Sequence, residues 1–391
     1  MISKFDGICK TLKIDALHPT AEDLAKLIHW WESSVSTDLH VDGDVQQQFV
    51  SYKALASGFL DRIEPNIQRD QMTSPIDALN NMTPLQLTVD IGFDVYLKSL
   101  KPTPAQVNNK INGKTLLHLA AARGNLHTVE TLLLLGANPL EKSTKGEPLL
   151  STTLMLPINH NEKMIKNKQQ IFSLLSRNRS LLQQTNESGD TILHTMAVYG
   201  YQELMKEMLS DSKKLASVAN NVMHYPIHKA ILNGQHECAK ILATIPGLKN
   251  LIDSKKQNAL HYAAKYGDAS MVRICLGSPI SKNSVDIRLQ TPLMLAVIDG
   301  NSDAVKELID SGVEVNMTDD VNRSALHYAV LHNDIKSLQL LLASPDINVN
   351  IRDDDAHHPL DLIQKGTQSD RIRELLLGKG ATHCQDLSSS P

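Results

Sequence analysis

Apolar residues recur in short helical patterns along most of the chain. Pairs such as Leu308-Ile309 and Leu341-Leu342 repeat at the spacing that places an apolar stripe on one face of a short helix. Each stripe follows a segment centred on small residues, such as Ala120-Ala121 or Ala263-Ala264, which lets another helix approach closely. The pattern predicts pairs of short helices, each pair with an apolar face that only the neighbouring pairs can cover.

The predicted helix pairs recur with a nearly constant period. A segment of the form Thr-Leu-Leu-His-Leu-Ala-Ala begins at Thr115, and its copies begin at Thr191, Tyr225, Asn258, Thr291 and Ser324, with weaker copies at Thr83, Glu147 and His358. Successive starts are separated by 32, 32, 44, 34, 33, 33, 33 and 34 residues. These spacings predict nine units of about 33 residues, one of which carries roughly 11 extra.

The core of this segment and its spacing resemble the ankyrin repeat, whose period is about 33 residues. The resemblance implies an all-α ankyrin-repeat solenoid with short β-hairpin turns over residues 78–380. We expect units to start near residues 78, 110, 142, 186, 220, 253, 286, 319 and 353. The shared residues are structural, so they do not identify a ligand.

Five histidines occupy the same position of the repeated segment. They are His118, His194, His228, His261 and His327. A metal ladder or proton relay is one interpretation, but the resemblance implies hydrogen bonds that tie neighbouring turns together, which we favour. Glycines that follow the first helix are expected to end it in the left-handed conformation, and these are Gly124, Gly200, Gly234, Gly267 and Gly300.

The segments outside the repeats are short. Residues 1–77 contain two predicted helices, one from Thr20 through Trp31 and one from Gln46 to Ile63. We expect an N-terminal helical cap on the open end of the solenoid, with a separate binding module as the alternative. Residues 381–391 are expected to form a flexible tail.

Composition narrows the classes of function. The chain has 391 residues and a formal net charge of -4, which gives no basic field for nucleic acid. Met1 to Ile14 is interrupted by lysines and an aspartate, and no apolar run approaches a membrane span. Four scattered cysteines indicate no disulfide framework. We expect a monomer in the cytoplasm, or in the host cytosol if the chain is an effector of an intracellular bacterium.

No catalytic motif, metal site or cofactor site is predicted. Cys238 lies near His236 but falls at an apolar core position, and Asp353–Asp355 is interpreted as a solvated acidic tip rather than a cation site. An insertion at 154–168 contains lysines at 163, 166 and 168. It is either a contact loop or a tolerated surface extension.

The resemblance implies that a protein partner binds to the hairpin tips and first helices. The predicted binding residues are Arg123, Tyr199, Asn233, Lys255, Gln257, Lys265, Tyr266, Arg288, Gln290, Asp299, Arg323 and His332. Tyr266, with basic neighbours, is the expected energetic centre. The tips become acidic toward the C-terminus, which predicts a partner with acid opposite the middle repeats and base opposite the last two.

Two further hypotheses come from the sequence. Leu308, Val315 and Asn316 are similar to the ankyrin sequence that asparaginyl hydroxylases modify, whereas a turn-stabilising role for Asn316 is the simpler interpretation. The expected function is a non-enzymatic interaction scaffold or adaptor. The alternative is an enzyme or enzyme-recruiting effector whose activity lies in residues 1–80 and the insertion.

Overall fold

The computed structural model describes residues 85–86, 89, 97–98, 102–155, 162–211, 213–277, 281–366 and 368–383. The predicted N-terminal cap, most of the first predicted repeat and all but the first residues of the C-terminal tail lie outside these ranges. The chain divides into two compact units, one ending at Asn186 and one beginning at Glu187. Each unit is described by itself.

The first unit contains helix pairs built on the predicted period. Its helices are α6 (Pro104–Asn108), α7 (Leu116–Arg123), α8 (Leu126–Leu134), α9 (Leu149–Leu154), α10 (Glu162–Leu175) and α11 (Arg179–Leu182). The first helix α7 packs on α9, and the second helix α8 packs on α10. The lysines at 163, 166 and 168 therefore belong to α10 and not to a loop, because the helix begins several residues earlier than predicted.

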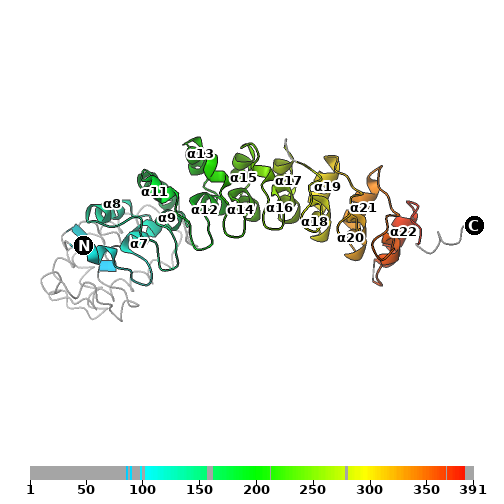
Figure 1. The fold of residues 1–391 in the computed structure, drawn as a ribbon, viewed down its shortest axis with the longest axis horizontal. Coiled ribbons are helices and arrows are strands. Elements are labelled where there is room, and N and C mark those ends of the chain that lie inside the picture. Colours follow the sequence, from blue (N-terminus) through cyan, green and yellow to red (C-terminus); the bar gives the residue numbers. More distant parts are fainter. Residues whose placement is uncertain are drawn as a thin grey trace, which may run out of the picture. The chain divides into compact units, whose positions relative to one another are not determined.

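The second unit continues the array in two rows of helices, which Figure 1 shows side by side. One row holds α12 (Ile192–Tyr199), α14 (Pro226–Leu232), α16 (Ala259–Tyr266), α18 (Pro292–Ile298) and α20 (Ala325–Leu331). The other holds α13 (Gln202–Asp211), α15 (His236–Ala243), α17 (Ala269–Leu276), α19 (Ser302–Asp310), α21 (Ile335–Ala343) and α22 (Ser369–Leu377). The 3-10 turns η4 (Lys213–Ser217) and η5 (Leu248–Asn250) follow second helices, whereas η6 (Pro359–Leu362) takes the place of the first helix in the last repeat and packs on α20.

The core is the apolar seam between consecutive helix pairs. Leu260, Val272 and Leu308 are fully buried, as are the small residues Ala263 and Ala296 where helices approach. Burying one such leucine or valine stabilises the fold by ~1.5–3 kcal/mol, and the seam repeats this in every unit. The all-α repeat array predicted from sequence is confirmed for the described residues.

Four of the five histidines lie in the first turn of the first helices and connect neighbouring turns, as expected. In His194, Nδ1 accepts the Thr191 N–H and Nε2 donates to the His224 carbonyl at 2.9 Å. His118, His261 and His327 make the same pair of contacts with their own N-cap residue and the next hairpin. Burial lowers the pKa of His118 to about 4, so the ring stays neutral and keeps one donor and one acceptor.

One predicted glycine role is wrong. Gly124 and Gly200 end their helices at φ 72° and 78°, but Gly267 adopts φ -91° and ψ 173°. The next residue, Asp268, accepts the Met271 N–H as the N-cap of α17, and the connection stays extended. Gly267 is required for space instead, because a Cβ there would lie 2.7 Å from the Ala263 carbonyl oxygen.

The hairpin turns before each first helix share one construction. The residue that opens the turn accepts the N–H groups two and four positions later. In the second unit these residues are Asn220, Asp253, Asp286, Asp319 and Asp353. Backbone bonds such as Ile287 N–H to Lys255 O and Asp320 N–H to Arg288 O then join successive turns. The turns hold their shape without forming extended strands among the described residues.

Candidate functional site

The predicted binding residues divide by exposure. Exposed positions are Arg123, Asn233, Lys255, Tyr266, Arg288, Asp299 and His332, and half-buried positions are Tyr199, Gln257, Lys265 and Arg323. Arg123 belongs to α7 in the first unit, and the others belong to the second. The second unit therefore presents side chains from the ends of α14, α16, α18 and α20 and from the hairpin tips.

Gln290 is not available to a partner. Its side chain is only 6% exposed, and its amide nitrogen donates to the Tyr328 hydroxyl at 3.3 Å. The prediction was wrong because the last residue of a hairpin turns inward beside the next first helix. Arg323 and Gln257 are also committed to the fold, the first to Asp353 and the second to Asp286.

Tyr266 ends α16 and is 50% exposed. Its ring centroid lies 5.9 Å from that of Tyr262, one helical turn earlier, and the Lys265 Nζ lies 4.9 Å from the Tyr266 centroid. Tyrosine is among the side chains that contribute most of the binding energy at protein interfaces, and a cation over its face is attracted to the ring. Tyr266 is thus an exposed side chain held in place from two sides.

Tyr262 connects this helix end to two hairpins. Its hydroxyl donates to Asp253 Oδ2 at 2.8 Å and lies 2.8 Å from His224 Nε2. Burial, together with the hydrogen bond to Asp253, raises the pKa of the Tyr262 hydroxyl. Its ring stacks on His228 at a centroid distance of 4.6 Å. This network fixes the base of the surface on which Tyr266 lies.

Histidine 228 departs from the other four histidines. Its Nδ1 accepts the Tyr225 N–H at 3.3 Å, but its buried Nε2 has no hydrogen-bond partner. Burial lowers its pKa to about 4. Stacking on Tyr262 replaces the hydrogen bond to the next hairpin, so this ring supports the aromatic network rather than the turn ladder.

The hairpin tips include apolar residues that the sequence analysis did not single out. Val222, Met223, Ile287 and Leu289 are 53%, 44%, 55% and 49% exposed. The signal in the sequence was their place in the turn. They lie one to three residues after the Asn or Asp that opens the turn. Between these tips lies the basic tip of Lys255 and Lys256.

Several tip residues have a backbone conformation that favours glycine. Met223, Lys256 and Leu289 adopt φ 61°, 57° and 56° at the same position of three consecutive turns. The equivalent positions at Gly146 and Gly189 hold glycine. A bulky residue in this conformation costs about 1–2 kcal/mol relative to its usual backbone geometry.

The acidic tip at the last hairpin is more ordered than predicted. Asp353 is buried and accepts the Arg323 Nε–H at 3.2 Å as well as backbone N–H groups of its own turn. Burial alone would raise its pKa, but the bonds from the His357 N–H and Arg323 hold that pKa below its usual value. Ligand atoms of Asp353, Asp355 and His357 lie within 4.8 Å of one another, yet the central carboxylate already serves the turn.

Cys238 is a buried core residue, as the sequence predicted, and Cys275 is buried as well. Burial raises the pKa of their thiols to about 11 and about 12, which keeps both protonated at neutral pH. His236 contacts Asp268 at 2.9 Å rather than activating the nearby thiol.

The insertion places a lysine in the core. Lys168 of α10 is fully buried, donates from Nζ to the Met155 carbonyl, and has its pKa lowered to about 8 by burial. The contact-loop interpretation of the insertion concerns residues 156–161, which lie outside the described part of the chain.

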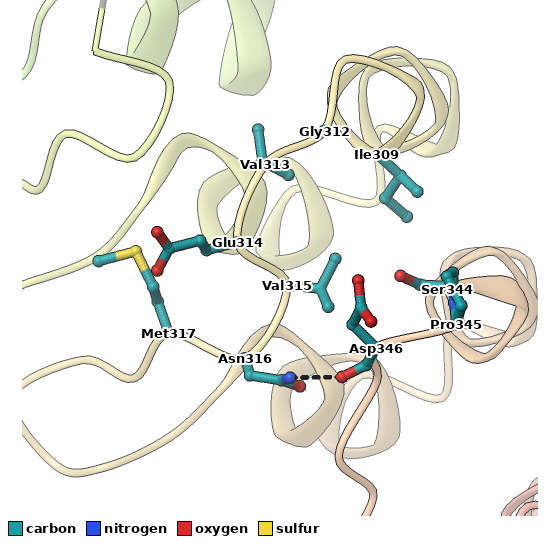
Figure 2. A pocket seen from close by; sticks show the side chains of 10 residues that line it. All are labelled: Ile309, Gly312, Val313, Glu314, Val315, Asn316, Met317, Ser344, Pro345 and Asp346. Carbon is teal, nitrogen blue, oxygen red and sulfur yellow. Dashed lines mark hydrogen bonds between the residues drawn. The ribbon is translucent and has the colours of Figure 1, made fainter.

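Asn316 lines an open hollow of about 630 Å³ (Figure 2). The hollow lies between the segment that follows α19 and the segment that follows α21. Its Nδ2 donates to the Asp346 carbonyl at 2.6 Å, and its Oδ1 accepts the Asn348 N–H at 2.8 Å. Asn108 and Asn350 bridge neighbouring units in the same way. Asn316 therefore bridges two neighbouring repeats rather than its own turn. Its hydroxylation stays a prediction, to be checked by intact mass after coexpression with a hydroxylase.

No helix in the described part of the chain is both long and apolar enough to cross a membrane.

The stacked helix pairs, joined by a ladder of hairpin turns, define the class of helical repeat proteins. The comparison with protein families assigns the class further. Ankyrin repeats in three copies match residues 193–286, 227–319 and 260–353, and a single ankyrin repeat matches residues 112–144.

The chain is therefore an ankyrin-repeat protein over these ranges. Similar solved structures include an ankyrin repeat domain from Acinetobacter baumannii AYE, at 26% identity and TM-score 0.45, covering 49% of this chain and 98% of that one. Another is the ankyrin repeat domain of Bcl-3, described as a unique member of the IkappaB protein family, at 19% identity and TM-score 0.48, covering 68% and 100%. No curated protein matches the chain significantly.

Proposed function

We propose that this chain is a non-enzymatic scaffold or adaptor that binds a protein partner through the second unit. The binding surface consists of the ends of α14, α16, α18 and α20 together with the hairpin tips. Ankyrin repeats are in general protein interaction modules, which supports the class of function. The proposal includes a monomeric, cytoplasmic protein.

The single observation that carries the proposal is the geometry of Tyr266. A half-exposed tyrosine normally loses rotamer freedom when a partner covers it, which weakens binding. Here the Tyr262 ring and Lys265 already restrict Tyr266, and Tyr262 is itself anchored to Asp253 and His224. A partner that covers Tyr266 would therefore gain buried area at a low entropic cost.

Charge determines the expected complementarity of the partner. Lys255, Lys265 and Arg288 surround the middle of the surface, whereas Asp320, Asp354 and Asp355 occupy the last tips. A partner that presents acid to the middle repeats and base to the last two would fit this arrangement. Screening by salt should reduce the association rate more than it increases dissociation, because these groups are exposed.

The test begins with affinity purification from cytosolic extract and mass spectrometry of the bound proteins. Tyr266→Ala and Arg288→Ala are each expected to weaken binding of the recovered partner about tenfold or more, with an unchanged melting temperature. Lys240→Ala on α15, an exposed position in the other row of helices, is the control and should leave affinity unchanged. Unchanged affinity in both surface variants would exclude this surface.

A further inference from the structure

Three consecutive hairpins of the second unit carry large side chains where the backbone favours glycine. Met223, Lys256 and Leu289 all have φ near 60°. The chain meets the same requirement with Gly146 and Gly189 elsewhere, and with Asn322, a residue type that tolerates this conformation, in the following turn. The unfavourable choice is therefore confined to these three tips and to Ala356 among the equivalent turns of the second unit.

The folded chain gains little from the two apolar residues in this set. Met223 and Leu289 leave 44% and 49% of their surface in solvent, so they contribute little to the core. Strain that brings no internal packing is typical of positions whose side chain serves an external contact. Val222 and Ile287, in the same two turns, are exposed to a similar degree.

The tip between them is basic. Lys255 and Lys256 are exposed, and the ammonium group of neither forms an ion pair with a carboxylate of the described residues. Arg288 lies between Ile287 and Leu289, and its Nε is 4.0 Å from Asp320 Oδ1, at the limit of an ion pair. We call residues 222–223, 255–256 and 287–289 the apolar-basic strip. It has exposed cationic side chains with aliphatic side chains on both sides.

We propose that the apolar-basic strip docks an extended, acidic segment of the partner protein whose aliphatic side chains cover the two apolar tips. This inference rests on the proposed function and names the chemistry of the partner. Carboxylates of the segment would lie over Lys255 and Lys256 and would compete with Asp320 for Arg288. The backbone bond from Ile287 N–H to Lys255 O fixes two of the tips side by side, so the strip presents these groups in a defined order.

Other anions fit the strip less well. Asp320, Asp354 and Asp355 follow directly on the next tips, and they would repel a phosphate backbone or an anionic lipid surface that extends beyond the strip. A peptide segment can end or change charge at that boundary, whereas a nucleic acid or a membrane keeps its charge. The apolar residues also match side chains of a peptide rather than phosphates.

The experiment starts from selection without a chosen ligand. A phage-displayed library of random twelve-residue peptides is selected on the full-length chain, and the most enriched peptide is measured by fluorescence anisotropy. We expect enriched sequences to combine Asp or Glu with Leu, Ile, Val or Met. The double variant Met223→Gly, Leu289→Gly should bind the enriched peptide at least tenfold more weakly, and its melting temperature should be equal or higher.

A matched control separates contact from backbone effects. Asn322→Gly makes the same type of change at the equivalent position of the next turn, outside the strip, and should leave affinity unchanged. Lys255→Glu with Lys256→Glu should abolish binding of the acidic peptide. Binding should also weaken severalfold between 50 and 300 mM salt because the pairs are exposed.

Several results would overturn the inference. These are enrichment of basic peptides, no enrichment at all, equal affinity in the glycine double variant, or equally tight binding of single-stranded DNA or phosphatidylserine vesicles. A change of oligomeric state in the strip variants would assign the strip to a second copy of this chain and reject the peptide. If peptides bind and depend on Tyr266 but not on the strip, the scaffold function stands and this inference fails.

Discussion

Leu289 has a side chain and a backbone conformation that do not suit each other. Its φ of 56° belongs to the left-handed region, where a leucine Cβ crowds its own carbonyl oxygen. Its N–H donates to the Asp286 carbonyl at 3.1 Å and closes the turn, a bond that a glycine at this position would keep. At such a position stability favours glycine, whereas binding of a partner favours a large apolar side chain.

Replacing Leu289 by glycine should stabilise the protein. Relief of the strain exceeds the extra entropy that glycine gives the unfolded chain, so we expect the free energy of unfolding to rise by about 0.5–1 kcal/mol. Leu289→Ala, which keeps a Cβ, is the control and should give no such gain. Urea denaturation followed by circular dichroism measures both, and equal stability of the two variants would refute the strain argument.

Asn316 should be a stabilising residue whatever its modification state. Asn316→Ala removes both hydrogen bonds to the 346–348 segment and leaves a carbonyl and an N–H without their partner. The expected loss is about 2 kcal/mol of unfolding free energy. Glu314→Ala, exposed two residues earlier, should change stability by less than about 0.5 kcal/mol. A similar loss in both would argue against the bridge.

At the scale of the element, the turn between the first and second helix of a repeat tolerates substitution for different reasons in two neighbouring repeats. Gly267 has a backbone conformation that any residue can adopt but no room for a Cβ, which would lie 2.9 Å from Met271 Cβ. Gly300 has φ 71° but open space around it. The two glycines thus look equivalent in the sequence and act for different physical reasons.

Alanine substitution distinguishes these reasons. Gly267→Ala should destabilise the protein by about 1–3 kcal/mol through overpacking between α16 and α17. Gly300→Ala should cost about 1 kcal/mol through backbone strain alone. Thermal or chemical denaturation measures both losses. A loss in Gly267→Ala that is no larger than the loss in Gly300→Ala would exclude a steric cause.

The sequence predicted the repeated elements because their requirements are local. Helix periodicity, the N-cap residues and the inward histidines each follow from neighbours within a few positions. Gln290 was wrongly expected on the surface because its burial depends on Tyr328, 38 residues away. The exposed apolar tips were missed for a similar reason: a four-residue turn has no periodicity to show which side chains face solvent.

At the scale of the whole molecule, the buried histidines make stability depend on pH in both compact units. His118 and His228 have pKa values lowered by burial from 6.5 to about 4, and burial also lowers those of His194, His261 and His327. The unfolded chain therefore binds more protons than the folded chain between these values. Stability rises with pH through this window and is lost as pH falls from about 6.5 toward 4.

We expect the urea midpoint to fall markedly between pH 7 and pH 5, with His118 and His228 each contributing up to about 3 kcal/mol by pH 4. His228→Gln should reduce this slope, since its ring no longer titrates in the unfolded chain. The carboxylate of Asp353, whose pKa is lowered, acts only below about pH 4 and does not confuse the measurement. A midpoint that stays constant or rises on acidification would contradict the neutral buried rings.

The hydroxyls of Tyr262 and Tyr328 have a consequence for how such an array can evolve. Each reaches the final side chain of the preceding turn, His224 in one case and Gln290 in the other, while also bonding to the aspartate of its own turn. Duplicating or shuffling a single repeat would separate these partners and leave their polar groups without a hydrogen-bond partner. Recombination should therefore succeed when a tyrosine module and its predecessor travel together as one heritable block.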